Sequence, residues 1–131
     1  MLVKKDGRMW STGIEPDIDI HGAKFMQVFS SGVVAAAAGN HNSIVLKRDG
    51  SVMMPVKDSQ GQFYFFDGFA ISKRTFTVVQ TIPHAYSVAT GAYHSMALTH
   101  GGYVWAMGWN QYGHLGAHEK LSEKEKKVIL E

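Results

Sequence analysis

The residues of this chain with the greatest chemical potential are its seven histidines. An imidazole can ligate a metal or act as a general base. The histidines do not form His-Glu-x-x-His, the spacing that places two ligands on one helix face. The chain has no cysteine, which excludes disulfides and thiolate metal sites. We therefore expect no metal site among the histidines, which are His21, His41, His84, His94, His100, His114 and His118.

Acids, serines and glycines give no better candidate for a catalytic site. Glu15, Asp17 and Asp19 lie close together, but a Ca²⁺ site needs six or more oxygens and a turn glycine at set spacing. Ser43 and Ser95 lack the Gly-x-Ser-x-Gly context of hydrolases. The chain has no Gly-Lys-Ser or Gly-Lys-Thr segment, which a phosphate-binding loop requires. The sequence predicts a protein that is not an enzyme, with no catalytic residue and no cofactor.

Composition limits the partners that the chain can have. It has 131 residues, 45% of them hydrophobic, and a net charge of +2. Its basic residues are scattered in pairs, which argues against nucleic acid as a partner, since phosphate binding needs clustered Lys and Arg. Charges stand where a signal peptide would have its apolar core, and no apolar run approaches the ~20 residues of a membrane span. We expect a soluble protein of the cytoplasm or nucleus.

A repeated pattern gives the main information about structure. A short apolar strand, a tight glycine turn and a second strand occur three times, at Leu2–Trp10, Ile44–Met53 and Met96–Trp105. Asp-Gly or Gly-Gly between alternating apolar residues predicts a β-hairpin, because glycine accepts the positive φ of the tight turn. The turn glycines Gly7, Gly50 and Gly102 are 43 and 52 residues apart.

A second block precedes two of these hairpins and confirms the repeat. It reads Ala38-Gly-Asn-His-Asn-Ser43 in one copy and Thr90-Gly-Ala-Tyr-His-Ser95 in the other. Gly39 and Gly91 are 52 residues apart, the same step as the turns that follow. We expect His94 to hydrogen-bond to backbone within the repeat, and Asn42, at the aligned position, to supply a similar donor.

The third copy continues furthest, through Gly91–Leu98 and then Val104–Gly116, and it resembles the repeat of the regulator of chromosome condensation family. The resemblance extends from Leu2 to Gly116 and implies a seven-bladed β-propeller. The second copy has lost the Trp-Gly pair, and the first departs from the pattern after Gly13. The residues that carry the motif, all interpreted as structural, are Gly7, Trp10, Gly13, Gly39, Gly50, Gly61, Gly91, His94, Ser95, Gly102, Trp105, Gly108, Asn110, Gly113, Leu115 and Gly116.

The predicted fold is all-β: a partial β-propeller of four-stranded antiparallel blades, with about two to three repeats of a seven-bladed type. Further strands are expected at 25–29, 33–38, 77–82 and 86–90. The alanines at 35–38 could form a helix by propensity, but the glycines that bound the segment and its alignment with Tyr86–Ala89 favour an inner strand, where small side chains suit the crowded centre of a propeller. We divide the chain into a partial repeat at 1–43, a degenerate repeat at 44–95, the start of the best-preserved repeat at 96–116, and 117–131. This last segment is a charged tail, a capped helix or the start of a next blade, with a strand at 128–130 preferred.

The resemblance implies a protein-binding surface. We expect a non-catalytic interaction scaffold whose protein partner the sequence does not identify. The alternative is a guanine-nucleotide exchange regulator of a small GTPase, and decay of the second repeat could also mark a remnant without function. Because a blade cannot bury its faces alone, we further expect a fragment of a longer propeller, or a chain that closes the ring by self-association.

Overall fold

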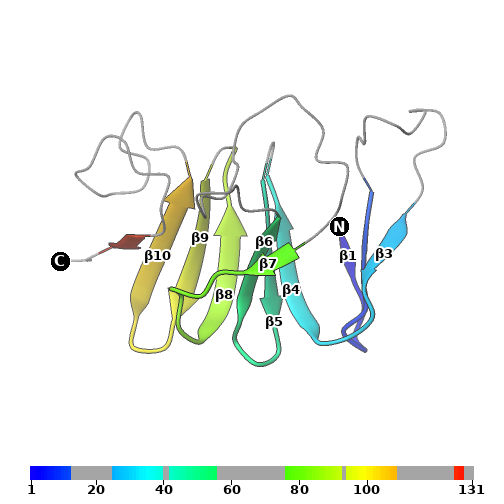
Figure 1. The fold of residues 1–131 in the computed structure, drawn as a ribbon, viewed down its shortest axis with the longest axis horizontal. Helices are drawn as coiled ribbons and strands as arrows, with labels where there is room; N and C mark the ends of the chain where they lie inside the picture. The colour runs from blue at the N-terminus through cyan, green and yellow to red at the C-terminus, as the bar shows by residue number, and fades with distance from the viewer. Residues whose placement is uncertain (13–24, 40–41, 56–75, 93, 109–125, 129–131) are drawn as a thin grey trace.

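The computed structural model describes residues 1–12, 25–39, 42–55, 76–92, 94–108 and 126–128. All regular elements in these segments are β-strands, and they form three antiparallel sheets arranged side by side (Figure 1). This confirms the all-β prediction and the partial propeller. No helix in the described segments has the length and apolar character needed to cross a membrane.

The first sheet has three described strands in the order β1-β2-β3, and the other two have four each, in the orders β4-β5-β6-β7 and β11-β10-β9-β8. The first sheet contains β1 (Leu2–Val3), β2 (Met9–Ser11) and β3 (Met26–Phe29). The second contains β4 (Val33–Ala38), β5 (Ser43–Lys47), β6 (Val52–Pro55) and β7 (Phe76–Val78). The third contains β8 (Ala85–Thr90), β9 (His94–Thr99), β10 (Tyr103–Gly108) and β11 (Lys126–Val128).

The predicted hairpins are present in all three sheets, and in the second and third sheets they are the central strand pairs. β1 pairs with β2, β5 with β6, and β9 with β10, each around one of the turn glycines. Gly7, Gly50 and Gly102 all have positive φ, at 84°, 84° and 78°. The four-stranded blade is therefore correct for the second and third sheets. In the described part of the first sheet, β1 has no neighbour equivalent to β4 or β8, so the strand count there is three.

The strand expected at 33–38 is confirmed, because the alanine-rich segment is the strand β4, paired with β5. Two other strand predictions need correction. β7 ends at Val78, because a turn begins there in which the amide of Ile82 donates to the carbonyl of Val79. β11 spans Lys126–Val128, which overlaps the expected 128–130 at Val128, and it pairs with β10 as the fourth strand of the third sheet rather than opening a next blade.

The core lies on both faces of the second sheet. Successive residues of a strand point to opposite faces, so Ile44 and Leu46 face one way and Val45 the other. Ile44 and Leu46 pack in the cluster that contains Ala97 and Met107 of the third sheet. Val45 packs with Met9 of the first sheet and Val33. Burial on both faces explains why β5 reads as the unbroken apolar run Ile-Val-Leu.

Candidate protein-interaction surface

Asn42 joins the second sheet to the third. It precedes β5 and is only 5% exposed. Its side-chain Nδ2 donates to the carbonyl oxygen of His94 and to Ser95 Oγ, both at 2.8 Å, at the start of β9. Ser95 is fully buried. The two sheets are thus fixed relative to one another by side-chain hydrogen bonds as well as by apolar packing.

The two repeat glycines upstream of β5 and β9 allow this close contact. A Cβ atom at Gly39 would collide with Asn42 Oδ1 and with the carbonyl oxygen of Gly91. A Cβ atom at Gly91 would collide with the imidazole of His94. The amide of each glycine also donates to the carbonyl of the residue three positions later, at 2.8 Å in both copies. Asn42 and His94 therefore occupy equivalent positions, as the repeat predicted.

Backbone hydrogen bonds join neighbouring sheets at the opposite end of these strands. The amide of Val33 donates to Gly7 at 3.0 Å, and the amide of Ala85 donates to Gly50 at 2.9 Å. The carbonyls of Gly7 and Gly50 thus each accept a hydrogen bond from the first residue of the inner strand in the next sheet. We call this end of the molecule, where the three hairpin turns lie together, the turn end (Figure 1).

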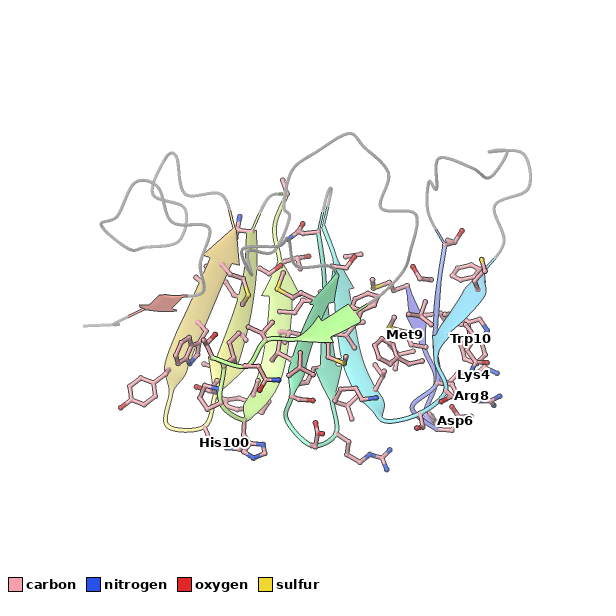
Figure 2. The ribbon with its side chains drawn as sticks, viewed as in Figure 1. Lys4, Asp6, Arg8, Met9, Trp10 and His100 are labelled. Atoms are coloured by element: carbon pink, nitrogen blue, oxygen red, sulfur yellow. The ribbon has the colours of Figure 1, made fainter. Side chains whose placement is uncertain are left out.

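The turn end carries a groove at the boundary of the second and third sheets. This turn-end groove has a cavity of about 310 Å³. Val34 and Tyr86 contribute exposed apolar surface, 48% and 51% exposed. The Tyr86 ring lies 5.2 Å from the His100 ring, centroid to centroid. Figure 2 shows His100 at the turn between β9 and β10. The polar and aromatic residues that line the groove are Lys47, Arg48, Asp49, His84, Tyr86 and His100.

The charged side chains of the groove differ in whether they already have a hydrogen-bond partner. Asp49 accepts hydrogen bonds from the Ser51 amide at 2.9 Å and from Ser51 Oγ at 2.6 Å. These bonds, with smaller contributions from the charges of Lys47 and His84, hold the pKa of Asp49 below its ordinary value. Lys47 Nζ donates to the Ser31 carbonyl at 2.8 Å. The Arg48 guanidinium is exposed and makes no hydrogen bond or ion pair with any described residue.

A second cluster of charges covers the hairpin of the first sheet. Asp6 and Arg8 form an ion pair with Oδ2 and Nη2 2.7 Å apart, and the bonds that Arg8 donates lower the pKa of Asp6. Lys4 Nζ and the Arg8 guanidinium lie 5.0 and 5.4 Å from the Trp10 ring centre (Figure 2). These distances are typical of cation–π contacts. The cations of this cluster are therefore already matched by local partners.

The structural role of the motif residues stays a prediction. Trp10 and Trp105 occupy the same repeat position and are both half-buried, but their contacts differ. Trp105 packs against the core cluster, whereas Lys4 and Arg8 lie over the ring of Trp10. The motif residues that lie outside the described segments are Gly13, Gly61, Asn110, Gly113, Leu115 and Gly116.

The sequence did not indicate the turn-end groove. No motif connects His84 and His100 with Arg48. His84 and His100 lie together because β8 pairs with β9, and the amide of His100 donates to the His84 carbonyl at 3.2 Å next to the pair Ala85 and Thr99. The 52-residue offset is a signal that could have indicated this arrangement. Gly32 and Arg48 lie 52 residues before His84 and His100, and the Arg48 amide donates to the Gly32 carbonyl at 2.8 Å. Within the described residues, no three His, Asp or Glu side chains gather as metal ligands.

Comparisons with known proteins match both the sequence of one repeat and the fold of the chain. The family model described as "Regulator of chromosome condensation (RCC1) repeat" matches residues 86–113, which span β8 to β10. The chain contains a regulator of chromosome condensation repeat. A comparison with curated protein sequences finds no match.

Solved structures of three larger chains, one of them yeast RCC1, have a similar fold. Prp20p from Saccharomyces cerevisiae, described with its binding properties to Gsp1p and histones, matches with a TM-score of 0.70 and 20% identity over 98% of this chain. Yeast RCC1 (Prp20) bound to Kap60 matches with a TM-score of 0.68 and 20% identity over 98% of this chain. Human WBSCR16 matches with a TM-score of 0.60 and 21% identity over 83% of this chain. The present chain spans about a third of these proteins, covering 35%, 34% and 28% of their lengths.

Proposed function

We propose that this chain is a non-catalytic protein-interaction module built from propeller repeats. The observation that carries the proposal is the turn-end groove, which crosses the boundary of two sheets that are locked together by Asn42. Binding residues are often found on loops that a rigid scaffold positions. Here the exposed charged side chains of Arg48 and Asp49 lie on the tight turn after β5, a strand that is buried on both faces.

The structural neighbours support a protein as the partner. The work on Prp20p describes binding to Gsp1p and histones, and the yeast RCC1 structure includes Kap60. Neither partner transfers to this chain on fold alone, because one propeller fold serves several functions. What we carry over is the class of ligand, a protein surface.

Site-specific photo-crosslinking in cells of the source organism tests the proposal. We would place p-benzoylphenylalanine at Tyr86, on the turn-end groove, and separately at Phe25, an aromatic residue of similar exposure, 57% against 51%, before β3. The proposal predicts discrete protein adducts from position 86. Absence of any discrete protein adduct from position 86, or the same adducts from position 25, would contradict it.

Guanine-nucleotide exchange on a small GTPase is the second candidate function. The similarity to Prp20p, with its reported binding to Gsp1p, is the observation that favours it. Release of labelled GDP from a panel of small GTPases, measured with increasing amounts of the chain, decides the question. Acceleration of one GTPase in proportion to the chain would favour exchange, and no acceleration of any would remove this candidate.

A further inference from the structure

Arg48 is the free cation of the turn-end groove, in the sense that it has no partner among the described residues. It follows β5, and its amide is fixed by the hydrogen bond to Gly32 at 2.8 Å. The backbone is therefore held while the guanidinium stays exposed. A guanidinium offers a planar fork of donors that fits a carboxylate with two parallel hydrogen bonds. Such a donor on a fixed backbone is well suited to bind an acidic side chain.

The described cations of the groove, Lys47 and Arg48, outnumber its one described acid, Asp49. Asp49 keeps its negative charge, but it accepts two hydrogen bonds from Ser51 within its own turn. Lys47 adds a second positive charge, held in place by the Ser31 carbonyl and by the Phe29 ring, whose centre is 4.8 Å from Nζ. His84 and His100 add further donors. The groove thus presents mainly donors and positive charge.

A second cavity continues the groove along the turn end. It has about 330 Å³, and its apolar lining comes from Val78, Val79, Ile82 and Pro83, beside the polar Ser51 and Gln80. Asp49, Gly50 and His84 line both cavities, so the two are adjacent. A ligand that fills both cavities is extended, with a negative group at Arg48 and an apolar group next to it in the second cavity.

We propose that the turn-end groove binds an extended acidic segment of a partner protein, with a carboxylate on Arg48 and a neighbouring apolar side chain in the adjoining cavity. This rests on the proposed function and names the chemistry of its partner. A nucleic acid fits less well, because the groove offers two cationic side chains of Lys or Arg and also holds Asp49.

Fluorescence anisotropy with the full 131-residue chain tests the inference. The probe is a labelled peptide with several glutamates followed by leucine and phenylalanine, and its control has glutamine in place of each glutamate. Arg48→Glu should weaken binding of the glutamate peptide about tenfold or more, because a hydrogen bond to a charged group contributes about 1.5–3 kcal/mol. Lys5→Glu is the matched control: it makes the same change in net charge at an exposed position on the first hairpin and should change affinity less than about twofold.

Each outcome decides the proposal. The proposal is supported if the chain binds the glutamate peptide, Arg48→Glu weakens that binding as expected, and Lys5→Glu preserves it. Equal losses in both variants would show general charge attraction and would overturn it, as would equal binding of the glutamine peptide. Tighter, Arg48-dependent binding of a single-stranded oligonucleotide of the same charge would also overturn it. If no peptide binds while position 86 still crosslinks to protein, the inference fails and the proposed function stands.

Discussion

Asn42 Nδ2 and Ser95 Oγ lie 2.8 Å apart across the boundary between the second and third sheets. Both residues are buried, and the same amide group also donates to the His94 carbonyl. The bond connects equivalent turns of successive repeats, since Asn42 occupies in one repeat the position that His94 occupies in the next. This joint holds the two sheets at the relative position on which the turn-end groove depends.

Replacing the Asn42 amide should destabilise the chain. Asn42→Asp keeps the shape but cannot donate, so it would place a carboxylate against the His94 carbonyl in a buried site. We expect a loss of at least about 2 kcal/mol in the free energy of unfolding. Urea denaturation followed by circular dichroism measures it. Asn42→His, which restores the residue type of the other repeat, should cost clearly less. Equal losses in the two variants would contradict the role of the donor.

The turn glycines should differ in their tolerance of alanine. Gly50 and Gly102 both have positive φ, which costs an alanine about 1–2 kcal/mol. A Cβ at Gly50 would also lie 2.6 Å from His84 Nδ1, whereas a Cβ at Gly102 would meet nothing within 4 Å. Gly50→Ala should therefore lower the free energy of unfolding by at least about 1 kcal/mol more than Gly102→Ala. Parallel thermal and urea unfolding would test this, and similar losses would argue against close sheet packing.

The carboxylates of two hairpin turns predict a pH dependence of stability. The pKa values of Asp49 and Asp6 are lowered in the folded chain, chiefly by hydrogen bonds from Ser51 and Arg8. A lowered folded pKa gives stability that is present above the ordinary value of 3.8 and is lost as pH falls through the folded value. Asp49→Asn should thus destabilise the chain at neutral pH and progressively less below pH 3.8. A destabilisation that persists undiminished in acid would contradict this assignment.

Exposed apolar side chains predict that the purified chain associates. Leu2, Phe25 and Met26 of the first sheet region are 51%, 57% and 49% exposed, and Tyr103 of the third sheet is 47% exposed. Apolar surface of this kind favours contact with other protein surfaces. Light scattering after size-exclusion chromatography should show a mass that rises with concentration, and a discrete trimer would indicate ring closure from three chains. A monomer at every concentration would contradict the prediction.

Local patterns predicted the strands well because their signals are themselves local. Glycine at positive φ with apolar residues on either side set the three hairpins, and the 52-residue step placed Asn42 and His94 in equivalent positions. The limits of β7 and the sheet of β11 were wrong because strand pairing and turn formation depend on distant residues. The division of the chain at 43, 95 and 116 stays a prediction, as does the structural role of the motif residues.

The candidate site could not be predicted in the same way. Arg48, His84 and His100 share no motif. Pairing of β8 with β9 brings the two histidines together, and Arg48 joins them only because the third sheet packs against the turn of the second. Trp10 shows the same limit, since Trp105 at the same repeat position packs against the core cluster while Lys4 and Arg8 lie over the Trp10 ring. Contacts between repeats depend on side chains that the repeat pattern leaves free to vary.

Recognition of a protein through the turn-end groove is tested most directly by locating a bound acidic segment on the chain. Amide chemical shifts of the isotope-labelled chain, recorded during titration with the glutamate peptide, report that location residue by residue. If the groove binds the peptide, the largest changes fall at Arg48–Gly50, at His84–Tyr86 and around His100. Largest changes at Lys4–Arg8, the other cluster of cations, or changes spread evenly over all lysines and arginines, would contradict it.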